Sequence, residues 1–158
     1  ETPLPNEMAI DYVKRLAIEK SRAGLANREK DIPILGSDTI VVLNNRIMEK
    51  PHDMDDAVEM LLSLSGSAHQ VMTAIALSDS EQTLSDVVIT DVTFCEISKQ
   101  QAVAYWRTGE PADKAGGYAI QGLAGKFVEN IRGSYFGVVG LPLRQTQVLV
   151  DKIFALKK

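Results

Sequence analysis

The chain has 158 residues, which is enough for one domain with a sizeable hydrophobic core. Hydrophobic residues make up 45% of it and charged residues 24%, a composition that argues against disorder and fibrous structure. Its net charge of -4 gives no overall basic character for binding nucleic acid or an anionic membrane, and its apolar runs are too short to span a bilayer. Cys95 is the single cysteine, as suits a reducing compartment.

Apolar residues recur with helical spacing near the start of the chain and predict a first helix. This apolar stripe consists of Ile10, Val13, Leu16 and Ala17. Asn6 is a candidate N-cap, and the helix is expected to end near Gly24 or Ala26. Lys20 lies one turn beyond the stripe, so its side chain either extends into solvent or projects into a cleft.

An acidic residue interrupts the next apolar run. Residues 32–43 are rich in β-branched side chains and bounded by turn residues, so they predict a buried strand that contains Asp38. Because burying a lone carboxylate is very costly, Asp38 must be solvated by a cleft, paired with a cation or bound to a metal. The alternative is a capping or turn aspartate close to Gly36.

Two asparagines then predict a tight turn. Asn44 and Asn45 tolerate positive φ, so a return strand over residues 46–48 would bring Lys50 back toward Asp38.

Alternating patterns predict further elements along the middle of the chain. A helix should begin at Asp53 and end at Gly66. Residues 69–77 and 84–97 predict a long hairpin, and Ser98 with Gln101 forms a capping box for a short helix.

Glycine becomes frequent between residues 109 and 140. Such a density indicates tight turns and close approach of the backbone to a ligand such as a phosphate or a base, or else ordinary strand connections. In the second case residues 126–131 and 135–139 would form a hairpin. Pro142 suits the first turn of a final helix. Strands and helices therefore alternate within one mixed α/β domain.

Several sequence blocks, taken in chain order, resemble the Maf family of nucleotide pyrophosphatases. The blocks are residues 19–23, 36–41, 49–51, 64–66, 69–71, 113–122, 133–135 and 138–142. Together they span nearly the whole chain, which makes chance a poor explanation. The resemblance implies a Maf/ITPase-like domain over residues 1–158, with a central mixed sheet and flanking helices.

The start of the chain departs from the family pattern. Members begin with a strand and a Ser-x-Ser-Pro-Arg-Arg loop, which is not found in this sequence, and Glu1 aligns with an acidic position after that loop. Because forked arginine contacts to phosphate cannot be reproduced by lysine, we expect a protein that starts at Glu1 to bind triphosphate poorly. Loss of the strand would expose apolar surface and an unpaired sheet edge, so we also expect such a protein to be less stable and prone to association.

The resemblance implies hydrolysis of a nucleoside triphosphate between its α and β phosphates. It assigns Asp38 as the proton acceptor and Lys20 and Lys50 as phosphate contacts. By its chemistry, Asp38 could deprotonate the water or hold the metal that does so, and Glu1 could complete an oxygen-rich site for Mg²⁺ or Mn²⁺. Both lysines would offset the charge of the departing pyrophosphate.

Substrate choice is expected to depend on Thr39 and Gln121, which match positions that mark the dTTP and UTP branch of the family. A side-chain amide such as that of Gln121 can both donate to and accept from the edge of uracil or thymine. The resemblance therefore implies a cytoplasmic hydrolase that acts as a homodimer on nucleoside triphosphates, without a nucleic-acid or membrane partner. The alternatives are the same reaction on 7-methyl-GTP or purine triphosphates, a non-catalytic nucleotide-binding regulator of septum formation, or a purely structural domain.

Overall fold

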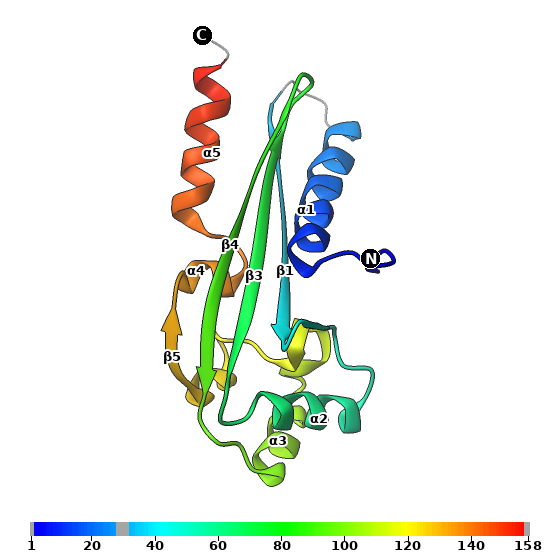
Figure 1. The fold of residues 1–158 in the computed structure, drawn as a ribbon, viewed down its shortest axis with the longest axis vertical. Coiled ribbons are helices and arrows are strands. Elements are labelled where there is room, and N and C mark those ends of the chain that lie inside the picture. The colour runs from blue at the N-terminus through cyan, green and yellow to red at the C-terminus, as the bar shows by residue number, and fades with distance from the viewer. Residues whose placement is uncertain (1, 28–31, 157–158) are drawn as a thin grey trace.

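The computed structural model describes residues 2–27 and 32–156 of the chain. These residues form a five-stranded sheet in the order β2-β1-β3-β4-β5, with helices on both faces (Figure 1). The strands are β1 (Ile34–Leu43), β2 (Arg46–Met48), β3 (Ala68–Ser78), β4 (Thr83–Phe94) and β5 (Val128–Arg132). The helices are α1 (Ala9–Ala26), α2 (Met54–Leu64), α3 (Lys99–Trp106), α4 (Tyr135–Val139) and α5 (Leu143–Ala155). The predicted mixed α/β domain is confirmed.

All strand pairings among the described residues are antiparallel, which corrects the prediction of a mixed sheet. Strands β1 and β2, and likewise β3 and β4, are joined by short turns, and a strand that returns through a short turn must pair antiparallel. Asn44 and Asn45 form the first turn with φ of 49° and 64°, as predicted. The expected long hairpin is β3 and β4, paired from Ala68 with Thr93 to Ser78 with Thr83.

Helix α1 packs closely on one face of the sheet because β1 presents a glycine to it. A Cβ atom on Gly36 would lie 2.4 Å from the backbone oxygen of Ala17 and 2.5 Å from the backbone nitrogen of Ser21. The apolar side chains buried between helix and sheet include Tyr12, Val13, Leu16, Ile40, Val42 and Met72. Side chains alternate along a strand, so Asp38 shares this face with Ile40. The approach at Gly36 thus sets the position of α1 over the acidic residue.

The opposite face of the sheet is covered by different helices at its two ends. Helices α4 and α5 lie beside β3 and β4, where Ile75 and Leu77 contact Leu149 and Ile153 (Figure 1). Toward the other end, α2, α3 and three short 3-10 turns enclose a second core. This core includes Leu61, Phe94, Tyr105 and Phe127. The 3-10 turns are η1 (Glu110–Asp113), η2 (Ala115–Gly117) and η3 (Leu123–Phe127).

Two helix starts agree with the sequence prediction. The Asp53 side chain accepts a hydrogen bond from the backbone N–H of Asp56 at the start of α2. Ser98 and Gln101 form both hydrogen bonds of a capping box at the start of α3. Local polar patterns therefore predicted both helix starts correctly.

Two other local predictions are wrong. Residues 135–139 form α4 rather than a strand, because the Ser134 hydroxyl accepts a hydrogen bond from the backbone N–H of Gly137 and begins a helix. Asn6 does not cap the first helix. It occupies a left-handed turn with φ of 60°, and α1 begins after Met8 without a side-chain cap.

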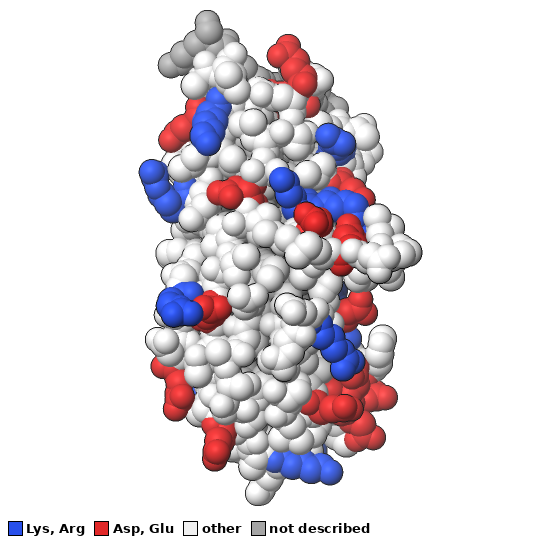
Figure 2. Space-filling view, viewed as in Figure 1, with Lys and Arg blue, Asp and Glu red and all other residues white. Residues whose placement is uncertain are grey.

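The surface carries both signs of charge. Figure 2 shows Lys and Arg side chains scattered among Asp and Glu, with acidic side chains gathered toward the lower right of this face. Among helices within residues 2–27 and 32–156, none has the length and apolarity needed to cross a membrane.

Candidate active site

The three residues predicted to be catalytic line one cavity of about 560 Å³. Lys20 comes from α1, Asp38 from the middle of β1, and Lys50 from the segment that follows β2. The β1–β2 turn returns the chain beside β1, and this places Lys50 near the acid as the sequence predicted. The structure therefore brings together residues that lie up to 30 positions apart in the sequence.

Asp38 is a strand residue rather than a turn residue. It pairs with Ala74 of β3, and its carboxylate Oδ1 lies 2.5 Å from Nζ of Lys20. The Asp38 side chain is 11% exposed and that of Lys20 is 39% exposed. This ion pair provides the cation that an acid within an apolar strand requires, and it leaves the pair at the wall of an open cavity.

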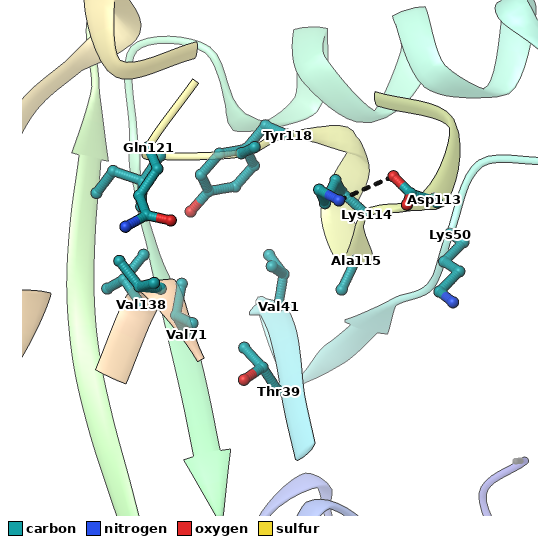
Figure 3. A pocket seen from close by; sticks show the side chains of 13 residues that line it. Thr39, Val41, Lys50, Val71, Asp113, Lys114, Ala115, Tyr118, Gln121 and Val138 are labelled. Atoms are coloured by element: carbon teal, nitrogen blue, oxygen red, sulfur yellow. Dashed lines mark hydrogen bonds and ion pairs between the residues drawn. The ribbon is translucent and has the colours of Figure 1, made fainter. Parts of the chain in front are cut away.

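A second cavity of about 270 Å³ adjoins the first, and it contains the residues predicted to determine specificity. Thr39, Lys50 and Ala115 line both cavities. Gln121 enters the second cavity from the turn between η2 and η3, on the wall opposite Thr39 (Figure 3). The pair Lys20–Asp38 is therefore continuous with the space around Thr39 and Gln121.

The walls of the second cavity are mostly apolar around a few polar groups. Val41, Val71 and Val138 lie between Thr39 and Gln121 in the close view (Figure 3). The hydroxyl of Thr39 is within 2.8 Å of the hydroxyl of Thr73. Such a combination of apolar walls and few polar groups suits a flat, hydrogen-bonding ligand.

A buried histidine supports one wall of this cavity. Nε2 of His69 lies 2.7 Å from the hydroxyl of Tyr118, which lines the cavity. Burial lowers the pKa of His69 to about 4 and raises the pKa of Tyr118, so both groups are neutral near pH 7. The prediction that His69 is a strand residue is confirmed, whereas its contact with Tyr118 was not anticipated.

Two charged residues that line the second cavity were not predicted as site residues from the sequence. Nζ of Lys114 lies 3.0 Å from Oδ1 of Asp113, at the same end of the cavity as Lys50 (Figure 3). The hydrogen bond from Lys114 and the nearby charges of Lys114 and Lys50 lower the pKa of the Asp113 carboxyl. Both residues belong to the glycine-rich block, where an Asp-Lys pair beside glycines was the available signal.

The predicted metal site is only partly described. Asp38 is in place, but Glu1 lies outside the described residues. Within residues 2–27 and 32–156, no three His, Cys, Asp or Glu side chains gather closely enough to hold a metal ion by themselves. Mg²⁺ is commonly bound by one or two carboxylates together with substrate phosphates, and Asp38 at the cavity wall fits that mode.

Comparisons with known proteins agree on one family. The model of the family described as Maf-like protein matches residues 1–153. A dTTP/UTP pyrophosphatase of Photorhabdus laumondii is 58% identical over 145 residues, which cover 92% of this chain and 74% of that protein. One of Saccharophagus degradans is 55% identical over 148 residues, covering 92% and 70%, and one of Escherichia coli is 53% identical over 154 residues, covering 98% and 78%.

Proposed function

Because the chain belongs to the Maf-like protein family, we propose that it hydrolyses dTTP and UTP to the nucleoside monophosphate and pyrophosphate. One structural observation carries the proposal. The Lys20–Asp38 ion pair lines a cavity that adjoins the space between Thr39 and Gln121, so a triphosphate and a base can be bound side by side.

The reaction requires a base and a set of cations. A water molecule attacks the α-phosphorus, its proton passes to the Asp38 carboxylate, and the bond from the α-phosphorus to the bridging oxygen breaks to release pyrophosphate. Lys20 is paired with Asp38 at the cavity wall, and Lys50 lies where both cavities meet. Their positive charges offset the negative charge that develops on the departing group.

The second cavity is suited to a pyrimidine base. The Gln121 amide can donate to a carbonyl of uracil or thymine and accept from its N–H, while Val41, Val71 and Val138 contact the ring faces. Thr39 is already hydrogen-bonded to Thr73, which fixes its side chain at the opposite wall. Lys114, which is paired with Asp113, lies at the end nearer Lys50, where the phosphates would lie.

The proposal includes a divalent cation, Mg²⁺ or Mn²⁺. Asp38 would hold it together with phosphate oxygens of the substrate, and Glu1 is the second protein ligand that we propose. When bound, such a cation would supply Lewis-acid polarisation of the phosphoryl group.

We further propose that the protein is a cytoplasmic homodimer. Its single cysteine agrees with a reducing compartment. Phe136, Val139 and Leu143 are exposed large apolar side chains close together in the chain at α4 and the start of α5, and such residues are typical of a surface that meets a second copy.

The function is tested by measuring pyrophosphate release from a panel of triphosphates in the presence of Mg²⁺ or Mn²⁺. We expect turnover of dTTP and UTP well above that of GTP, ATP and 7-methyl-GTP. Asp38→Asn keeps the side-chain shape but removes the base, so turnover should fall by about 10²- to 10⁴-fold while the protein stays folded. Near-normal turnover by folded Asp38→Asn would refute the assigned base, and binding without any turnover by the wild type would indicate a regulator.

A further inference from the structure

A partly buried hydrogen-bond network holds the chain on both sides of Gln121. The Tyr105 hydroxyl donates to Oε2 of Glu110 and accepts from the backbone N–H of Ala119 at 3.1 Å. Oε1 of Glu110 accepts from the backbone N–H of Leu123, also at 3.1 Å. These contacts hold the chain two residues before and two residues after Gln121. The turn that carries the amide is therefore fixed at both ends.

The Glu110 side chain packs directly against the turn that carries Gln121. A Cβ atom on Gly122 would lie 1.9 Å from Oε1 of Glu110, so the carboxylate rests directly against the backbone next to Gln121. The backbone N–H of Gly122 donates to the carbonyl of Ala119 and closes the turn. The carboxylate of Glu110 thus occupies the space that a side chain at position 122 would need.

The two residues that build the network are well fixed themselves. Tyr105 is 2% exposed and packs edge-on against the ring of Phe127. Burial raises the pKa of the Glu110 carboxyl, but hydrogen bonds from Tyr105 and from the backbone N–H groups of Leu123 and Ala124 lower it further than burial raises it. Glu110 is therefore an ionised acceptor at neutral pH. Neither residue lines the cavity, whereas Ala119, Ile120 and Gln121 do.

We propose that Tyr105 and Glu110 are positioning residues that determine nucleobase selectivity by holding the Gln121 amide in the orientation that matches a pyrimidine. This inference rests on the proposed function, because it assigns the second cavity to the base. The physical reason is that a selective hydrogen bond requires a donor and acceptor held to within a few tenths of an ångström. A turn that is hydrogen-bonded at both ends to Tyr105 and Glu110 provides that rigidity.

Two variants separate positioning from ordinary stability. Tyr105→Phe keeps the ring but removes both hydroxyl hydrogen bonds. Glu110→Gln keeps the shape of the side chain, but its amide NH2 group replaces one of the two oxygens that accept hydrogen bonds. We expect each to lower kcat/KM for dTTP about tenfold, mainly through KM, and to leave the weak activity on GTP unchanged, as the loss of one well-aligned hydrogen bond implies. The matched control is Glu129→Gln, a change at an exposed residue of β5. It should alter neither kcat/KM for dTTP nor the activity on GTP.

The decisive measurement adds each change to Gln121→Ala. If the network acts through Gln121, Tyr105→Phe should cost no further dTTP-over-GTP selectivity in the Gln121→Ala background. If it is only structural, the fall should be the same in both backgrounds and should affect both nucleotides equally, and the inference would be overturned.

Binding measurements distinguish failure of this inference from failure of the proposed function. Dissociation constants for dTTP and GTP are measured by calorimetry in the Asp38→Asn background, with and without Tyr105→Phe. If the wild type hydrolyses dTTP selectively and the variants keep the same selectivity, the inference is overturned and the proposed function stands. If the wild type shows no turnover, the proposed function is overturned. If the protein nevertheless binds dTTP more tightly than GTP and Tyr105→Phe abolishes that difference, the inference is supported. Equal binding of dTTP and GTP to Asp38→Asn protein overturns the inference.

Discussion

At the scale of single residues, Asp38 shows how an acid can be part of an apolar strand. Its neighbours Ile40, Val41 and Val42 are buried in the core, yet its own carboxylate meets Lys20 from α1 at the cavity wall. The sequence predicted that Asp38 required a cleft, a cation or a metal, and the structure supplies the first two. The choice among these was not predictable, because Lys20 lies 18 positions away and reaches Asp38 only through the packing of α1 on β1.

Gln121 is the residue whose change should most affect substrate choice. We expect Gln121→Ala to lower kcat/KM for dTTP and UTP by about 10- to 100-fold and to leave any activity on purine triphosphates nearly unchanged, because only the pyrimidine edge loses matched hydrogen bonds. Steady-state kinetics on the four common triphosphates measure this, with Gln147→Ala on the exposed face of α5 as the control. Equal losses on every base would instead place Gln121 in the catalytic machinery.

At the scale of elements, the contact between α1 and β1 determines whether the ion pair can form. Gly36 lies two residues before Asp38, and the carbonyl of Ala17 that it approaches lies one turn before Lys20. Any side chain at position 36 must push the helix away from the strand. The helix would then carry Lys20 away from Asp38, so the same contact governs stability and the site.

Gly36→Ala should therefore be costly for both stability and activity. Overpacking against rigid backbone typically costs about 1–3 kcal/mol of unfolding free energy, and we expect this variant at or above the upper end. The matched control is Gly24→Ala at the same interface, where the added Cβ meets only side-chain atoms of Ile34, the nearest being Cγ2 at 2.6 Å, and no backbone. Urea denaturation and dTTP hydrolysis should separate the two variants, and equal stabilities would contradict the argument.

An element is predicted well from sequence when the interactions that form it lie within a few residues of one another. The Asn44-Asn45 turn and the Ser98 capping box were predicted because all their interactions lie within a few residues. Residues 135–139 are rich in the aromatic and β-branched side chains of strands. Yet Ser134 starts a helix there, and the Thr73 hydroxyl of β3 donates to the carbonyl of Gly137. That contact joins residues 64 positions apart, so no local pattern could reveal it.

At the scale of the whole molecule, the candidate site is assembled from segments about 100 residues apart. Lys20, Asp38 and Lys50 come from the first third of the chain, whereas Lys114 and Gln121 come from the glycine-rich block. Sequence patterns and resemblance predicted four of these residues individually but not the distances between them. Lys114 and the network behind Gln121 were missed, because their roles depend on which cavity the block faces.

The buried His69 should make the stability of the whole molecule depend on pH. Its pKa is about 4 in the folded protein and near 6.5 when unfolded, so between these values the unfolded chain binds more protons than the folded one. Stability is therefore highest above pH 6.5 and falls as the pH decreases toward 4, by at most about 3 kcal/mol from this group. Nδ1 of His69 is buried without a hydrogen-bond partner among the described residues, so a proton there would have no partner to stabilise it.

Replacing His69 by Gln should remove this part of the pH dependence, because glutamine can still hydrogen-bond to Tyr118 but does not titrate. The measurement is the free energy of unfolding in urea at intervals from pH 4 to pH 7.5, for the wild type, His69→Gln and the exposed-histidine control His52→Gln. Carboxylates titrate alike in all three proteins, so the difference between curves isolates the histidine. We expect the wild type and His52→Gln to lose stability in parallel below pH 6.5, and His69→Gln to lose less. If the His69→Gln curve instead runs parallel to that of the wild type over this range, His69 is not held neutral by burial. Its contact with Tyr118 at the wall of the second cavity must then be explained in another way.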